Sequence, residues 1–168
     1  VGTPIPGPGV FGHGGGMAGE HIVFIDGALR SASGPRYVNE SQSWMGTIDP
    51  ANPTRIAWAK LPPHPAPIRY RAAAASCGAH VIFAGGTDNP YNYNGIGYDG
   101  VASEPLSSGV ALDTKQRVWK LLPPAPGATM DHRGLVIRGD TGWIVGGMGE
   151  DQAVSRKVIR WRLGLCPL

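Results

Sequence analysis

Two short apolar runs that each end in a pair of glycines decide the fold: HVIFAGG at residues 80–86 and TGWIVGG at residues 141–147. Their glycine pairs lie 61 positions apart (147 − 86). The same offset relates a second pair of similar segments, WAKLPPHP at 58–65 and WKLLPPAP at 119–126. An earlier and weaker copy, HIVFIDG at 21–27, lies 59 positions before the first run (86 − 27). One offset shared by different landmarks indicates an internal repeat of about 60 residues.

Each copy of the repeat reads as four short strands separated by turn residues. In the middle copy we expect strands at about 70–79, 80–84, 109–113 and 117–122. These runs are rich in β-branched and aromatic residues and are too short for helices. A repeated four-stranded antiparallel sheet is typical of a β-propeller blade. The sequence therefore predicts an all-β fold with about three blades, at about 7–62, 68–123 and 129–168.

The third predicted blade is incomplete. Its third strand is expected at 157–163, and the tryptophan of a fourth strand would fall at position 180, beyond Leu168. Because propellers have about four to eight blades, we expect half of a six-blade ring. A longer parent chain, a second chain or a second copy would complete it, and the sequence leaves these three open.

The composition excludes several classes of protein. Gly 26 and Pro 16 make up a quarter of the 168 residues, which argues against a helical bundle. The chain is 16% charged and 42% hydrophobic, which argues against disorder. No apolar run approaches the roughly 20 residues of a membrane span. The net charge of +3 is mild and scattered, so nucleic acid is not an expected partner.

The cysteines and histidines show no spacing of a metal site. Cys77 and Cys166 form no disulfide framework and no Cys-x-x-Cys knuckle, so we expect a small buried side chain at 77 and a free thiol at 166. The five histidines lack His-x-His and His-x-x-x-His spacing. No phosphate-binding loop is present either. The sequence therefore predicts neither a metal nor a cofactor.

The repeat resembles the kelch motif: an apolar strand ending in Gly-Gly, a strand ending in an Asp turn at 110–114, then Trp and Leu-Pro. The long loops after the glycine pair and the Trp…Leu-Pro-Pro ending are similar to those of bacterial galactose-oxidase-like kelch proteins and N-acetylneuraminate epimerases (sialic acid mutarotases). This resemblance implies a carbohydrate-active or carbohydrate-binding protein, with cofactor-independent anomerisation of a sugar as the candidate reaction. It also implies export to the periplasm or the medium, as does the start at Val1. The Tyr-His pair of copper oxidases is absent, so that activity is not expected.

Strand direction predicts which loops share a face. The loops that lead into the first strand of each copy lie at 12–13, 68–71 and 129–133. We expect them on the same face as the loops that join the second strand to the third. Arginine forks match carboxylates, so four arginines at this face are candidate ligands for an acidic sugar or peptide: Arg30, Arg69, Arg71 and Arg133. For each one, a structural salt bridge or a solvated position is the alternative.

The longest loop follows the glycine pair of the middle copy and runs to about residue 104. A loop of about 20 residues is more often functional or mobile than neutral. Amides and phenols hydrogen-bond sugar hydroxyls, and aromatic rings stack on sugars. The candidate sugar-binding residues in it are Asp88, Asn89, Tyr91, Asn92, Tyr93 and Asn94. The same residue types also build tight turns, and that alternative stays open.

Proton transfer is assigned to Asp131, His132 and Glu104, because ring opening of a sugar needs one acid and one base. The alternative is that Asp131 caps a turn and pairs with Arg133. A noncatalytic kelch module that binds a peptide or a protein is the second candidate function. Fold alone does not choose between a sugar and a protein partner.

Overall fold

The computed structural model describes residues 1–132 and 134–166, and its regular structure is antiparallel β apart from one 3-10 turn, η1 (Glu150–Gln152). The strands are β1 (Gly14–Ala18), β2 (His21–Ile25), β3 (Ala28–Arg30), β4 (Tyr37–Asn39), β5 (Ser43–Asp49), β6 (Asn52–Lys60), β7 (Ala73–Cys77), β8 (His80–Ala84), β9 (Gly109–Asp113), β10 (Val118–Leu122), β11 (Leu135–Arg138), β12 (Thr141–Val145) and β13 (Val158–Arg162). Within the described residues, no helix has the length and apolar character needed to cross a membrane.

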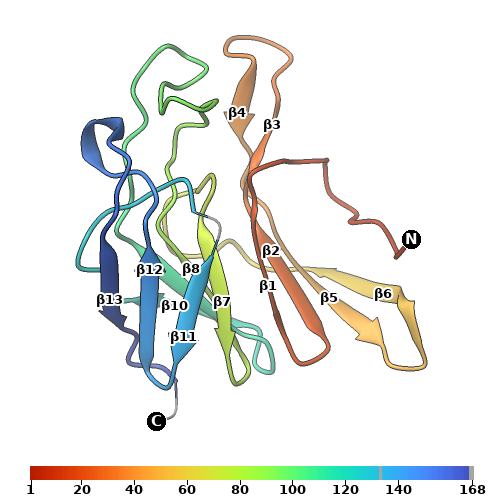
Figure 1. Cartoon of the computed structure of the whole chain (residues 1–168). Helices are drawn as coiled ribbons and strands as arrows, with labels where there is room; N and C mark the ends of the chain where they lie inside the picture. The colour runs from red at the N-terminus through yellow and green to blue at the C-terminus, as the bar shows by residue number, and fades with distance from the viewer. Residues whose placement is uncertain (133, 167–168) are drawn as a thin grey trace.

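The strands form three sheets that stand side by side, plus a small hairpin (Figure 1). Two sheets have four strands, in the orders β1-β2-β5-β6 and β7-β8-β9-β10, and the third has the order β11-β12-β13. None closes into a barrel, and β7 packs against both β1 and β11. Sheets that meet through their first strands are arranged as partial propeller blades, as the sequence predicted.

The strand registers repeat with the offsets found in the sequence. Gly14 lies opposite Ile25 in the first sheet, and Ala73 lies opposite Ala84 in the second, 59 positions later in both strands (14 to 73, 25 to 84). The second and third strands of the middle sheet have the predicted bounds, 80–84 and 109–113. The first strand is shorter than the predicted 70–79, because Arg71 and Gly78 both adopt positive φ (55° each) and end the extended backbone.

The Trp…Leu-Pro-Pro repeat ties neighbouring sheets together. The indole Nε1 of Trp119 donates a hydrogen bond to the carbonyl of Pro62 (2.9 Å), and that of Trp161 donates to Pro123 (3.0 Å). Trp161 is buried in the core between the second and third sheets. Its ring lies where a Cβ on Gly109 would be, so glycine at 109 is required by close packing.

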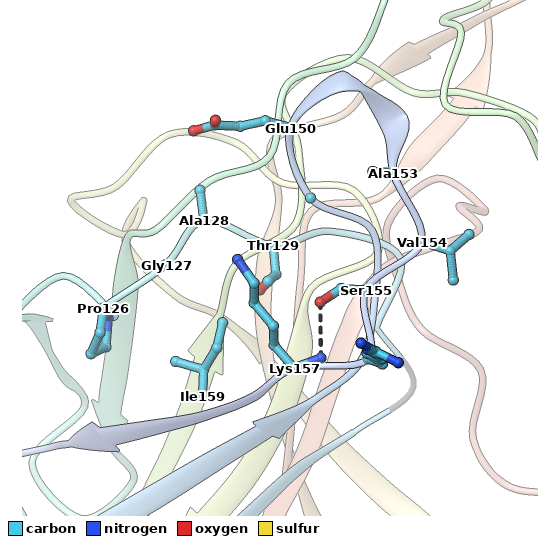
Figure 2. A pocket seen from close by; sticks show the side chains of 12 residues that line it. Pro126, Gly127, Ala128, Thr129, Glu150, Ala153, Val154, Ser155, Lys157 and Ile159 are labelled. Carbon is cyan, nitrogen blue, oxygen red and sulfur yellow. Dashed lines mark hydrogen bonds between the residues drawn. The ribbon is translucent and has the colours of Figure 1, made fainter.

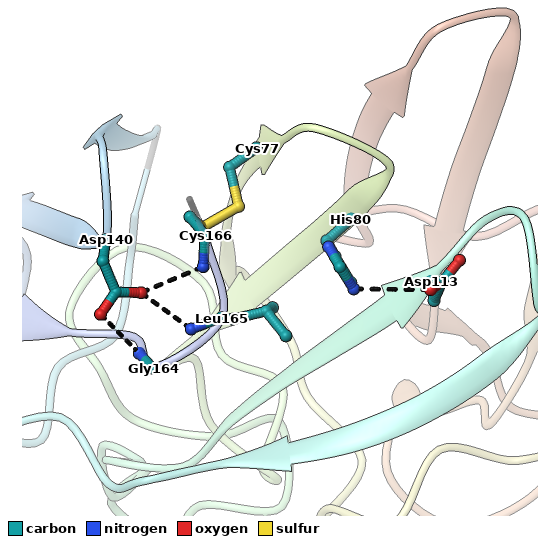
Figure 3. Close-up of a disulfide and its surroundings, with 7 residues drawn as sticks. All are labelled: Cys77, His80, Asp113, Asp140, Gly164, Leu165 and Cys166. Carbon is teal, nitrogen blue, oxygen red and sulfur yellow. Dashed lines mark hydrogen bonds and ion pairs between the residues drawn. A yellow bond between two sulfur atoms is a disulfide. The ribbon is translucent and has the colours of Figure 1, made fainter. Parts of the chain in front are cut away.

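The cysteines are paired, so the prediction of a free thiol at 166 is wrong. Cys77 at the end of β7 and Cys166 after β13 form a disulfide with a Cα–Cα distance of 5.8 Å (Figure 3). The carboxylate of Asp140 accepts backbone hydrogen bonds from Gly164 (3.1 Å), Leu165 (2.8 Å) and Cys166 (3.0 Å). The fold lays this C-terminal segment against the second sheet, a contact that a separation of 89 positions does not reveal.

Candidate functional site

Three equivalent corners lead into the first strands of the sheets. Gly12, Arg71 and Asp131 all have left-handed backbone, with φ of 65°, 55° and 60°. The residue before each corner bridges to the segment after a second strand: Phe11 to Ala28, Tyr70 to Thr87 and Met130 to Met148. The corners are also linked directly, because Arg71 N donates to Gly12 O (2.7 Å) and His132 N donates to Arg71 O (3.3 Å). This series lies on the same face as the long loop and the β3–β4 hairpin (Figure 1).

Two of the three corners hold side chains where glycine would be favoured. A non-glycine residue in this conformation is uncommon and costs about 1 kcal/mol. At the first corner glycine is required, since a Cβ on Gly12 would overlap the Tyr70 ring. Four other non-glycine residues also have positive φ: Asp26, Arg117, Asp151 and Gln152. What distinguishes Arg71 and Asp131 as the candidate site is that they lie on neighbouring corners and contact each other.

The two strained residues bind each other. Arg71 Nη1 lies 2.8 Å from Asp131 Oδ1, and the two side chains keep 21% and 26% of their surface exposed. The Arg71 guanidinium also lies 5.0 Å from the Tyr70 ring centre and 4.9 Å from that of Tyr91. Both rings are fully buried, so these cation–π contacts lie partly away from solvent. Arg71 is thus held in one place at the surface by a carboxylate and two rings.

The two tyrosine hydroxyls at this site carry their protons and lack partners. Burial raises the pKa of Tyr70 and of Tyr91, although Arg71 acts in the opposite direction on both. Burial lowers the pKa of Arg71, but Tyr70, Asp131 and Tyr91 outweigh that effect and raise it. Among the described residues neither phenol oxygen has a hydrogen-bond partner. A buried polar group without a partner costs free energy.

The other predicted arginines lie elsewhere. Arg69 is fully buried, and its Nη1 donates to the carbonyls of Gly85 (3.4 Å) and Ser108 (3.2 Å). Burial lowers its pKa to about 10, although Asp26 acts against that shift. Arg30 is exposed at the end of β3, and Arg133 lies outside the described residues.

The long loop is built largely by its own asparagines. Asn89 Nδ2 donates to both carboxylate oxygens of Asp99 (3.1 and 3.2 Å), and Asn94 Oδ1 accepts the backbone N–H of Ile96 (3.1 Å). Asp88, Asn92 and Tyr93 are exposed. Of the six predicted ligands in this loop, the structure brings Tyr91 to Arg71 and places the others along the loop.

The three candidates for proton transfer have different surroundings. Asp131 lies beside Arg71, whereas His132 is buried and its Nε2 lies 2.7 Å from Thr129 Oγ1. The His132 ring lies between two glycine pairs, because a Cβ on Gly85 or on Gly147 would come within 2.9 Å of it. Glu104 is exposed in the long loop. The glycine pairs that reveal the repeat thus also make room for this histidine.

We expect the pKa of His132 to lie below the ordinary value of 6.5. Burial lowers its pKa from that ordinary value, so the unfolded chain binds its proton first as the pH falls. The free energy of unfolding should therefore decrease between pH 7 and pH 5, and His132→Gln should remove part of that decrease. Ring chemical shifts of His132 by NMR check the prediction directly. A midpoint at or above pH 6.5 would contradict it.

A groove of about 500 Å³ lies beside β13 (Figure 2). Its lining includes Thr129, Glu150, Lys157 and Ile159, and Lys157 N donates to Ser155 Oγ (3.1 Å). It contains none of the predicted site residues. Within residues 1–132 and 134–166, no group of three or more His, Cys, Asp or Glu side chains is placed to hold a metal ion.

Sequence reasoning missed four aromatic residues near Arg71. Tyr70 is in the predicted 68–71 loop, directly before the corner arginine, and that position was the available signal. Phe11, Tyr37 and Tyr98 come from three other segments, which only the fold brings together.

Comparison with known proteins adds a fold relationship. No family model matches the chain, and no curated protein matches it. The solved structure of YjhT is similar, with a TM-score of 0.67 over 93% of this chain and 15% sequence identity. The chain spans 44% of the length of YjhT. At this identity the similarity concerns the fold alone, and the chain shares that fold with less than half of YjhT.

Proposed function

We propose that this chain forms part of a kelch propeller that binds an acidic sugar at the Arg71 corner. One observation carries the proposal: Arg71 is partly exposed and is fixed by Asp131 at 2.8 Å and by the rings of two buried tyrosines, Tyr70 and Tyr91. The kelch-like repeat and its resemblance to sialic acid mutarotases support a sugar as the ligand. The fold similarity to YjhT is consistent with that resemblance and adds nothing about the substrate.

The chemistry of the corner suits a carboxylate. Arg71 donates from Nη1 to Asp131, and its side chain keeps 21% of its surface exposed. A guanidinium is a planar fork that matches a carboxylate. Tyr70 and Tyr91 are fully buried, so their rings hold the guanidinium from the core side. Asp131 holds the guanidinium in place and offsets part of its charge.

Binding is supported better than catalysis. Anomerisation needs an acid and a base that both reach the sugar. His132 is buried against Thr129, which leaves Asp131 as the placed carboxylate and Glu104 as an exposed one. A mutarotase activity would therefore use Asp131, together with a group from the rest of the ring.

The disulfide supports export of the protein. Disulfides persist in oxidising compartments and are rare in the cytosol. The Cys77–Cys166 bond joins two sheets, and Asp140 positions its C-terminal segment. The proposal therefore places this propeller in the periplasm or outside the cell, where free acidic sugars are available to it.

The test is a binding panel measured by calorimetry. The protein should bind N-acetylneuraminate or galacturonate and should not bind galactose. Arg71→Ala should weaken binding by about 10-fold or more, since a hydrogen bond to a charged group contributes about 1.5–3 kcal/mol. Arg30→Ala is the matched control, because Arg30 is an exposed arginine on the neighbouring hairpin. Equal binding of galactose, or full affinity in Arg71→Ala, would rule the proposal out.

A second candidate function is a protein-binding module. The long loop exposes apolar side chains at Tyr93 (79% exposed), Val101 (60%) and Ile96 (38%). Contiguous exposed apolar surface is a feature of protein interfaces. This alternative predicts peptide binding that Tyr93→Ala removes, and no response to any sugar in the panel.

A further inference from the structure

Three more aromatic rings extend from the Arg71 corner along the same face. Phe11 meets Tyr70 edge-on at 5.6 Å, Tyr37 meets Phe11 at 4.9 Å, and Tyr98 meets Tyr37 at 4.7 Å. We call Phe11, Tyr37 and Tyr98 the aromatic shelf. Tyr70 and Tyr91 are fully buried, whereas the shelf residues keep exposed surface, 37% in the case of Phe11. The row thus begins in the core at Tyr70 and continues to the surface.

The shelf is assembled from three segments that hydrogen bonds fix to one another. Phe11 and Ala28 exchange backbone hydrogen bonds (2.9 and 2.8 Å), which join the N-terminal segment to the β3–β4 hairpin. Asn39 at the end of β4 donates from Nδ2 to the carbonyl of Asp88 (2.6 Å), which joins the hairpin to the long loop. Because these bonds hold the segments together, the rings are pre-organised for a ligand.

Two cations lie along this row. The Arg71 guanidinium covers Tyr70 at its buried end, and that of Arg36 lies 5.3 Å from the ring centre of Tyr37, within the shelf. Arg36 forms no ion pair with any described residue, so its charge is not offset there. Aromatic surface between two guanidinium groups is complementary to an anionic ligand that also has apolar C–H faces. Sugars that carry carboxylates have both features.

We propose that the aromatic shelf is a second sugar subsite, so that the ligand is an acidic oligosaccharide and not a single sugar. The acidic residue of the ligand binds Arg71, and the neutral pyranose joined to it lies on Phe11 and Tyr37. This inference rests on the proposed function, because it takes the acidic sugar at Arg71 as its first contact. It adds the length of the ligand and two residues, Phe11 and Tyr37, that contact its second ring.

The experiment compares a monosaccharide with a longer probe. N-acetylneuraminate, sialyllactose and lactose are titrated by calorimetry into the protein and into Phe11→Ala, Tyr37→Ala and Tyr37→Leu. Sialyllactose should bind about 10-fold more tightly than N-acetylneuraminate, since each aromatic contact contributes about 2- to 10-fold. The alanine variants should lose that gain while N-acetylneuraminate affinity stays unchanged. Tyr37→Leu keeps apolar packing and should lose the gain as well, which separates stacking from loss of structure.

Tyr93→Ala is the control, because Tyr93 is an exposed tyrosine of the same loop outside the shelf. It should leave both affinities unchanged. If sialyllactose binds no more tightly than N-acetylneuraminate, the second subsite is overturned and the Arg71 site stands. If neither sugar binds, the proposed function is overturned and the subsite with it.

Discussion

Replacing Cys77 and Cys166 with serine is expected to lower the free energy of unfolding by about 4 to 5 kcal/mol, because the disulfide closes a loop of about 90 residues. That is a large share of the roughly 5–15 kcal/mol that holds a domain folded. Among residues 1–132 and 134–166, β13 pairs with β12 alone, and this edge adds to the dependence of the third sheet on the disulfide. The third sheet should therefore be the first part of the chain to unfold.

Urea unfolding with and without a reductant measures this effect. The free energy of unfolding of the wild-type chain should fall when reductant is added. That of the double serine variant should be low in both conditions and should not change with reductant. Asp140→Asn is the companion variant, because it weakens three backbone hydrogen bonds to the same segment and leaves the covalent bond intact. Asp140→Asn should lower the free energy of unfolding by less than loss of the disulfide does. A wild-type unfolding curve that reductant does not move would refute the prediction.

Asp26→Asn is expected to lower the free energy of unfolding by about 3 to 5 kcal/mol, the cost of leaving a buried charge unpaired. Asp26 is fully buried, and its Oδ2 lies 2.8 Å from His64 Nε2 and accepts the backbone N–H of Arg69 at 2.9 Å. The Arg69 guanidinium is fully buried too, and Asp26 is the charge that favours its ionised form. Asparagine has the same shape and tolerates the φ of 56° at this position. The substitution therefore removes the charge without changing the backbone conformation.

A double-mutant cycle with Arg69→Met separates the charge effect from packing. The double variant removes both charges, so its loss in the free energy of unfolding should be smaller than the sum of the losses in the two single variants. Thermal or urea unfolding of the four proteins provides the measurement. Independent, additive losses would show that Asp26 and Arg69 are not coupled across the first two sheets.

The parts of the fold that the sequence predicted have strong local signals. The strands at 80–84 and 109–113 are apolar runs that end in Gly-Gly and in an Asp turn. The β3–β4 hairpin was not predicted, because its strands have three residues each and no clear alternation. The first middle strand was predicted too long at both ends, since the residue type of Arg71 gives no sign of a left-handed corner. The disulfide depends on contact between sheets, which no local pattern encodes.

The face of the candidate site was predicted from the strand topology, whereas its individual residues were predicted only in part. Arg71, Asp131 and Tyr91 were selected because their loops share a face, and the structure brings these three together. Arg69 and Arg71 looked equivalent in the sequence, yet one is fully buried and the other lines the surface. The left-handed corner turns the chain between them. Such a turn, and rings contributed by distant segments, require the fold before they can be assigned.

The most direct measurement is an NMR titration that follows the Arg71 Nε–H and backbone signals of this chain. Addition of N-acetylneuraminate should shift the Arg71 Nε–H signal and the signals of Tyr70, Tyr91 and Asp131, and galactose should leave them unchanged. Those shifts would support a carboxylate bound at the strained corner. If the acidic sugar instead moves signals of the groove beside β13, or moves none, the Arg71 corner is not the site and the function proposed for it is wrong.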